Sequence, residues 1–196
     1  MTRLELITQI VAHCQQQGSS YVEDSASQVA LVNSALREVS HSGRLFQSDN
    51  IRFNVINGTA RYSYDKPGAT FTLDGVQVGL VEIRNIYQKP VGQTALNLMV
   101  VFEMRPGKVT IGDLASNFPN YLDTVAFPAQ NPRAWYFTAP ATLVLWPAPA
   151  ETAEWVLDAY YYHPPLTADG SEVLLPDALE REFVLYCASQ FIYANA

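Results

Sequence analysis

The sequence contains few of the residues that build reactive or metal-binding sites. It has two cysteines, Cys14 and Cys187, and three histidines among 196 residues. Both cysteines lie in apolar helical patterns far apart in the chain, which indicates buried free thiols. The spacing of Cys and His matches no metal site, and no nucleophilic-serine motif, glycine-rich phosphate loop or Cys-x-x-Cys pair occurs. We therefore expect no cofactor, no metal and no catalytic residues.

Long apolar runs are missing as well. No stretch approaches 18 consecutive apolar residues, so the sequence predicts no membrane-spanning helix. Glu5 interrupts the N-terminal Met-Thr-Arg-Leu-Glu-Leu, which does not match a signal peptide. We expect synthesis in the cytoplasm and no contact with a membrane.

Charged residues are scarce, at 16% of the chain, whereas aromatic residues reach 12%. A chain of this kind often covers part of its surface with a partner, although a β-rich core also favours Tyr and Phe. The net charge of −7 is uneven, because residues 111–196 carry 2 basic and 10 acidic residues. Such a surface does not hold a nucleic-acid backbone, but nucleic acid can slide past it.

Two N-terminal segments have the apolar spacing of amphipathic helices. The first covers residues 3–17, and the second runs from about 26 to 41, with Ser25 and Gln28 as a capping box and Gly43 as a stop. The apolar stripe of the first consists of Leu4, Ile7, Val11 and Cys14, widened by Leu6 and Ile10, and that of the second of Val29, Val32, Leu36 and Val39. Neither helix is stable alone, so both must pack on something else.

From about residue 50 to residue 163 the apolar residues recur with period two. Two hairpins are predicted, Ile51–Val55 with Ala60–Tyr64 through Asn57-Gly58, and Ala69–Leu73 with Val76–Leu80 through Asp74-Gly75. About eight short strands follow from the pattern, which is typical of an antiparallel β-sandwich or a barrel-like sheet.

The last segment predicts a third helix, which begins after Leu174-Leu175-Pro176 and is apolar nearly all round beyond Phe183. We therefore expect an α+β fold in which N-terminal helices (1–45) and a C-terminal helix (174–196) pack together. The β-domain (50–163) is inserted between them, and residues 1–196 form a single unit.

An ordered set of aromatic and proline motifs resembles the adaptor, or head-to-tail connector, proteins of tailed bacteriophages. The motifs are Asn131–Phe137, Leu143–Pro149 with its Trp-Pro-Ala-Pro corner, Trp155–Tyr161 followed by Pro164-Pro165-Leu166, and Leu174-Leu175-Pro176. Leu31–Val39 is similar to a Leu-x-Asn-x-Ala helix of that family. The resemblance spans most of the chain, although residues 50–125 match only in strand pattern.

The resemblance implies a structural virion protein and not an enzyme. It implies a homo-oligomeric ring of about 12 copies in the virion neck, between the portal protein of the capsid and the tail or nozzle protein. Genomic DNA would pass through this ring during ejection without specific binding.

The resemblance also directs attention to two sets of contact residues. The candidates for contact with the portal or a neighbouring copy are Arg37, Arg44, Phe183, Tyr186, Phe191, Ile192 and Tyr193, and those for contact with the tail or between subunits are Asn117, Phe118, Asn120, Tyr121 and Phe127. The alternative function is a carbohydrate- or receptor-binding β-module of a phage tail, in which aromatic residues of Ala134–Phe137 and Trp146 stack on a sugar. An enzyme assembled from distant residues is the third possibility.

Overall fold

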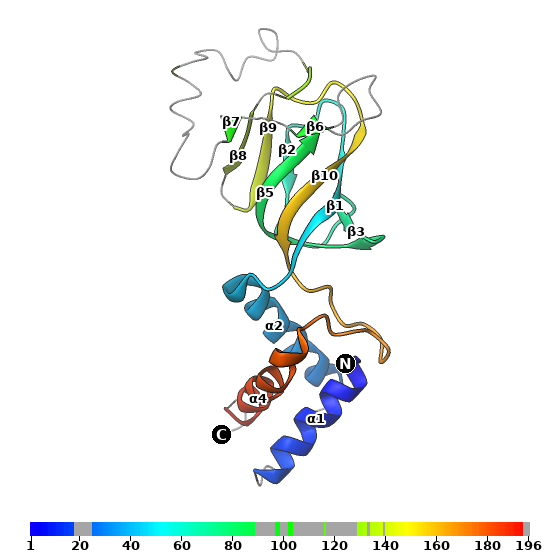
Figure 1. Ribbon diagram of the computed structural model, residues 1–196, viewed down its shortest axis with the longest axis vertical. Coiled ribbons are helices and arrows are strands. Elements are labelled where there is room, and N and C mark those ends of the chain that lie inside the picture. The colour runs from blue at the N-terminus through cyan, green and yellow to red at the C-terminus, as the bar shows by residue number, and fades with distance from the viewer. Residues whose placement is uncertain are drawn as a thin grey trace. The chain divides into compact units, whose positions relative to one another are not determined.

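The computed structural model describes residues 1–17, 25–88, 97–98, 102–103, 116, 129–132, 134–138 and 140–193. The chain divides into two compact units (Figure 1). Met1–Leu45 and Tyr162–Ala196 form the helical unit, and Phe46–Tyr161 form the β unit. The predicted α+β class, with helices from both ends of the chain and antiparallel sheets between them, is confirmed.

The helical unit contains α1 (Arg3–Gln16), α2 (Ser25–Gly43) and α4 (Asp177–Tyr193). Helix α4 packs against both α1 and α2. Its buried side chains are Phe183, Val184, Cys187, Ala188 and Phe191. However, Leu185 and Tyr193 are exposed, so one side of this apolar helix is not covered.

Helix α1 begins with a capping box that the sequence analysis did not identify. The Thr2 hydroxyl accepts a hydrogen bond from the Glu5 N–H (3.3 Å), and the Glu5 carboxylate accepts one from the Thr2 N–H (2.7 Å). The hydrogen bond from the Thr2 N–H holds the pKa of the Glu5 carboxylate below its usual value. The buried face carries Leu6, Ile10 and Cys14, four residues apart. The predicted stripe was therefore rotated, because Leu4 lies on the other side of the helix and is 55% exposed.

The β unit contains two sheets. A six-stranded antiparallel sheet has the order β4-β3-β1-β10-β5-β6, and a four-stranded sheet has the order β2-β9-β8-β7, in which β7 and β8 run parallel. The strands are β1 (Gln47–Val55), β2 (Arg61–Ser63), β3 (Phe71–Leu73), β4 (Val76–Gln77), β5 (Leu80–Gln88), β6 (Asn97–Leu98), β7 (Phe102–Glu103), β8 (Ala134–Thr138), β9 (Thr142–Trp146) and β10 (Ala153–Tyr161). No closed barrel forms among the described strands, and the arrangement is sandwich-like.

The first predicted hairpin was wrong, because β1 and β2 lie in different sheets and β2 pairs with β9. The Tyr62 hydroxyl accepts a hydrogen bond from the Ile56 N–H (3.0 Å) and donates one to the Thr59 carbonyl (2.8 Å). The turn at Gly58 is thereby held as a corner between the sheets. The rings of Phe53 on β1 and Tyr62 on β2 meet edge to face, with centroids 4.9 Å apart.

The second predicted hairpin is confirmed, since β3 pairs with β4. Asp74 and Gly75 both have positive φ (50° and 82°), as a two-residue turn between antiparallel strands requires. The core beside this hairpin is aromatic, because the Phe53 ring packs on those of Phe71 and Trp155, at centroid distances of 5.0 and 5.9 Å.

Candidate assembly site

The structure places the seven residues predicted to contact the portal or a neighbour in the helical unit. Arg37, Arg44 and Tyr193 are exposed, Tyr186 and Ile192 are half-buried, and Phe183 and Phe191 are buried. Phe191 belongs to the core of the unit. The other candidates, Asn117, Phe118, Asn120, Tyr121 and Phe127, lie outside the described residues.

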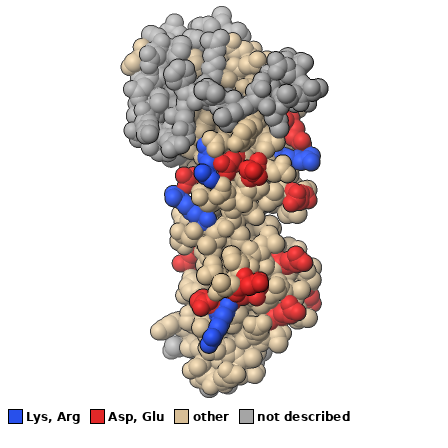
Figure 2. Space-filling model, viewed as in Figure 1, with Lys and Arg blue, Asp and Glu red and all other residues tan. Residues whose placement is uncertain are grey.

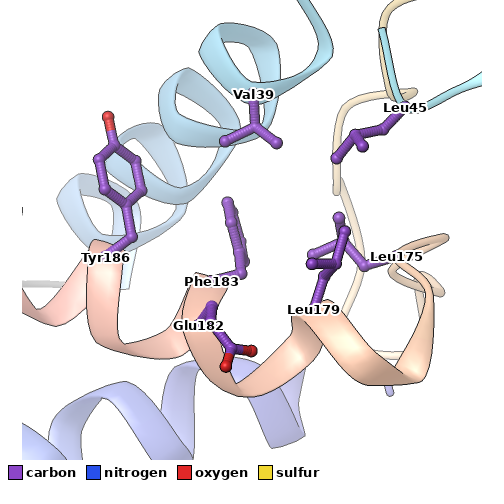
Figure 3. A pocket seen from close by; sticks show the side chains of 7 residues that line it. All are labelled: Val39, Leu45, Leu175, Leu179, Glu182, Phe183 and Tyr186. Atoms are coloured by element: carbon purple, nitrogen blue, oxygen red, sulfur yellow. The ribbon is translucent and has the colours of Figure 1, made fainter. Parts of the chain in front are cut away.

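An apolar groove of about 240 Å³ lies between α2 and α4 (Figure 3). It is lined by Val39, Leu45, Leu175, Leu179, Glu182, Phe183 and Tyr186. Figure 3 shows the Phe183 ring pointing toward Val39, with the leucines at one end and Tyr186 at the other. The groove therefore brings together Phe183 and Tyr186 of the predicted set, whereas the other lining residues were not predicted as site residues.

Side chains on one face of α4 form one wall of the groove. Leu179, Phe183 and Tyr186 lie at positions i, i+4 and i+7 of α4 and share one face. The Pro176 carbonyl accepts a hydrogen bond from the Leu179 N–H (2.8 Å) at the start of the helix. Proline suits this position because the first helical turn leaves N–H groups unpaired.

The end of α2 forms the other wall. Arg44 adopts a left-handed conformation (φ 47°) directly after the helix, so that the chain turns back and Leu45 joins Val39 at the groove. Gly43 makes room for this turn, because a Cβ atom added there would lie 3.1 Å from the Leu45 Cγ.

Carboxylates edge the groove. The Tyr186 hydroxyl donates a hydrogen bond to Glu38 Oε2 (2.7 Å), which raises the pKa of Tyr186. Glu182 lies at the edge of the groove and is exposed. The site thus combines an apolar floor with acidic groups at its margin, which suits a partner that inserts a neutral or cationic group.

Arg37 already has a partner within the chain. Its guanidinium lies 4.0 Å from the centroid of the Tyr162 ring, a cation–π contact. The His41 ring stacks on Tyr162 at 6.3 Å, and the Tyr162 hydroxyl lies 3.3 Å from His41 Nδ1. These three side chains fix the chain where it enters the helical unit after β10.

Polar side chains of α2 position the segment that leads into α4. The Asn33 amide clamps the backbone of Leu166, accepting from its N–H (2.8 Å) and donating to its carbonyl (3.4 Å). The Ser40 hydroxyl accepts a hydrogen bond from the His163 N–H (3.1 Å). In the sequence, Asn33 is recognisable only as part of the Leu-x-Asn-x-Ala helix motif, and that motif does not reveal the loop that Asn33 and Ser40 hold.

The buried His163 ring has a defined tautomer. Its Nε2 accepts a hydrogen bond from the Leu174 N–H (2.9 Å), so the proton resides on Nδ1, which donates to the Pro164 carbonyl. Burial lowers the pKa of His163. The ring is therefore a neutral link between the loop and the residues before α4.

The thiols of the helical unit are inert. Cys14 and Cys187 are free and buried. Burial raises the pKa of Cys14 and raises that of Cys187 to about 12. Among the described residues, no group of three or more His, Cys, Asp and Glu side chains could hold a metal ion.

Among the described residues, no helix has the length and the apolar character that spanning a bilayer requires.

Three of the four aromatic residues proposed for sugar binding belong to the core, and the fourth, Phe137, is half-buried. Trp135, Tyr136 and Trp146 are only 3%, 7% and 8% exposed. A stacking platform needs an exposed ring face, so these rings do not support the carbohydrate-binding alternative.

The chain is thus an α+β protein whose helical unit carries an apolar groove. Comparison with family models gives the family: residues 1–196 match the model for the SU10 adaptor protein. The chain belongs to this family of phage head–tail adaptors, as the resemblance predicted. As an adaptor it is a component of the virion neck and associates with other virion proteins. A search among curated proteins found no match.

Proposed function

We propose that the chain forms a ring of about 12 copies that joins the phage portal to the tail or nozzle and surrounds the channel through which DNA leaves. The observation that carries this proposal is the apolar groove between α2 and α4, in a chain whose full length matches an adaptor family. An open apolar groove is a typical docking site for another protein.

The helical unit is the proposed contact region for the portal and for neighbouring copies. Its exposed apolar side chains are Leu4, Leu174, Leu185 and Tyr193, in addition to the groove. The predicted contact residues that are at least partly accessible are Arg37, Arg44, Tyr186, Ile192 and Tyr193. The segment with Asn117, Phe118, Asn120, Tyr121 and Phe127 remains a proposed contact with the tail or between subunits.

The charge distribution supports a channel that does not retain DNA. Only Arg133 and Arg181 are basic in residues 111–196, against 10 acidic residues. On the face drawn in Figure 2, uncharged residues form most of the described surface and charged side chains occur in small groups. A protein that neutralises few phosphates releases few counterions and therefore binds DNA weakly.

Negative-stain imaging of the chain mixed with the portal protein of the same phage tests this proposal. We expect a ring of adaptor density on one face of the portal. A chain that stays monomeric and never joins the portal would contradict it. Thermal-shift measurements with glycans provide the contrast, because stabilisation by a glycan without ring formation would favour the carbohydrate-binding alternative.

A further inference from the structure

We propose that the apolar groove of one copy accepts the Tyr193 side chain of an adjacent copy. The proposal rests on the ring proposed above and names the pair of surfaces that would join its subunits. The ring could form through other surfaces, so the two proposals can fail separately.

Tyr193 has the properties of a protruding anchor. It occupies the last described turn of α4 and is 79% exposed, more than any other large apolar side chain among the described residues. Tyrosine is enriched at the energetic centres of protein interfaces, where its ring enters a pocket and its hydroxyl finds a partner.

The groove has the size and lining for a phenol ring. Its volume is about 240 Å³, whereas an apolar cavity of about 150 Å³ already takes up benzene. Val39, Leu179 and Phe183 supply an apolar floor (Figure 3).

The margin of the groove matches a phenol electrostatically. Glu182 is exposed at the edge and can accept a hydrogen bond from an entering hydroxyl. The same pairing already exists beside it, where the Tyr186 hydroxyl donates to Glu38. A neutral donor is therefore favoured over an anionic side chain.

The position of the two surfaces on one helix makes the contact intermolecular. Glu182 and Tyr193 are 11 residues apart in α4, which places their Cα atoms about 16 Å apart along the axis. A copy therefore does not fill its own groove with its own Tyr193. A protrusion and a groove at different sites of one subunit give a head-to-tail interface, which closes into a ring when the rotation allows.

Disulfide trapping on the portal tests the contact. In full-length chain carrying E182C and Y193C, a disulfide within one copy is excluded, since about 16 Å exceeds the ~7 Å limit between bridged Cα atoms. The native cysteines are buried and add little background. The matched control is R181C with Y193C, because Arg181 is exposed and lies on the side of α4 opposite Phe183.

We expect the E182C/Y193C chain, assembled on the portal and oxidised, to give covalent dimers and larger species at least about tenfold more abundant than those of the control pair. Rings on the portal without this excess would overturn the Tyr193 contact and leave the proposed function standing. Wild-type chain that forms no ring at all would overturn both.

A second experiment separates the contribution of the Tyr193 aromatic ring from that of its hydroxyl. Y193A should weaken assembly on the portal about tenfold or more. Y193F should weaken it less, because it keeps the apolar anchor and loses only the hydrogen bond to Glu182. Equal assembly of Y193A and wild type would overturn the proposal.

Discussion

Asn33 is a polar side chain that holds a loop from within a helix. Both halves of its amide are bonded to the backbone of Leu166, a residue that is almost completely buried. A backbone N–H and carbonyl in such a place must find partners, and the loop has none of its own for them in a sheet or helix. Asn33 thus connects α2 with the segment before α4.

We expect N33A to lower the free energy of unfolding by about 1–3 kcal/mol, because it leaves the Leu166 N–H and carbonyl without their partner. Urea unfolding followed by circular dichroism measures this change. Ser34 is the neighbouring exposed residue of α2, and S34A should stay within about 0.5 kcal/mol of wild type. Equal stability of N33A and S34A would contradict the role of the clamp.

His163 makes stability depend on pH in a defined direction. Its pKa in the folded chain lies below the reference value of 6.5, so the unfolded chain binds a proton that the folded chain excludes. Protonation would also cost the hydrogen bond that Nε2 accepts from Leu174. The free energy of unfolding should therefore fall as the pH drops below about 6.5.

Urea unfolding between pH 8 and 5.5 measures this effect in wild type and in H163Q, where the variant should show a flatter dependence. The range stays above the usual pKa of exposed carboxylates, which limits their contribution. If the free energy of unfolding of H163Q depended on pH as steeply as that of wild type, the effect would come from other titratable groups.

At the scale of elements, Gly79 lies in the short connection between β4 and β5. A Cβ atom added to it would lie 3.0 Å from the Asp65 carbonyl oxygen and 3.1 Å from the Lys66 carbonyl carbon. These are backbone atoms and cannot rotate away. The Leu80 N–H also donates to the Tyr64 carbonyl, which ties the connection to the chain that follows β2.

G79A should therefore destabilise the chain by about 1–3 kcal/mol through overpacking. G68A is the matched control, since nothing lies within 4 Å of a Cβ atom at Gly68; it should be neutral or slightly stabilising, because alanine restricts the unfolded chain. Thermal unfolding of the two variants tests the difference, and similar melting temperatures would refute it.

The packing of α1 on α4 predicts unreactive thiols. Cys187 is fully buried with a pKa of about 12, and Cys14 lies in the buried face of α1. A thiol reagent should modify neither until urea unfolds the chain, since the thiolate is the reactive form. L185C provides the control, because its exposed thiol should react at once. Rapid modification of two thiols in native wild type would show that the helices separate.

The positions of helices and strands could be predicted from the sequence better than the way these elements pair and pack. Helix periodicity predicted α1, α2 and α4, and alternation predicted β1, β3 and a strand-rich segment between about residues 50 and 163. The Asn57-Gly58 turn was predicted to form a hairpin. The same two residues suit a turn that connects two different sheets, so the turn sequence alone does not distinguish the two cases. The hydrogen bonds of Tyr62 decide between them, and those depend on the folded sheets.

The candidate site could likewise be predicted only where its residues belong to one helix. Phe183 and Tyr186 could be proposed from the apolar face of one helix, but their partners Val39, Leu45 and Leu175 come from other segments. The sequence also does not tell that Leu6 is buried and Leu4 is exposed. Both leucines fit an apolar stripe, and only the position of α4 decides which of them it covers.

For the whole molecule, family membership and charge lead to a prediction about nucleic acid. A chain with 12 basic and 19 acidic residues should give no mobility shift with duplex DNA at about 0.15 M salt. Electrophoresis with linear DNA of mixed sequence measures this, with a basic DNA-binding protein as the positive control. Retention that weakens steeply with salt would reveal a phosphate-binding surface and contradict a channel that releases DNA freely.

The ends of the β unit lie side by side. The Tyr161 N–H donates to the Phe46 carbonyl (2.9 Å), and the rings of these two residues pack at 5.9 Å. A segment whose two ends are neighbours can be removed or replaced without stretching the chain that remains. Residues 46–161 therefore have the properties of a segment that can be exchanged as a unit while the rest of the chain is kept.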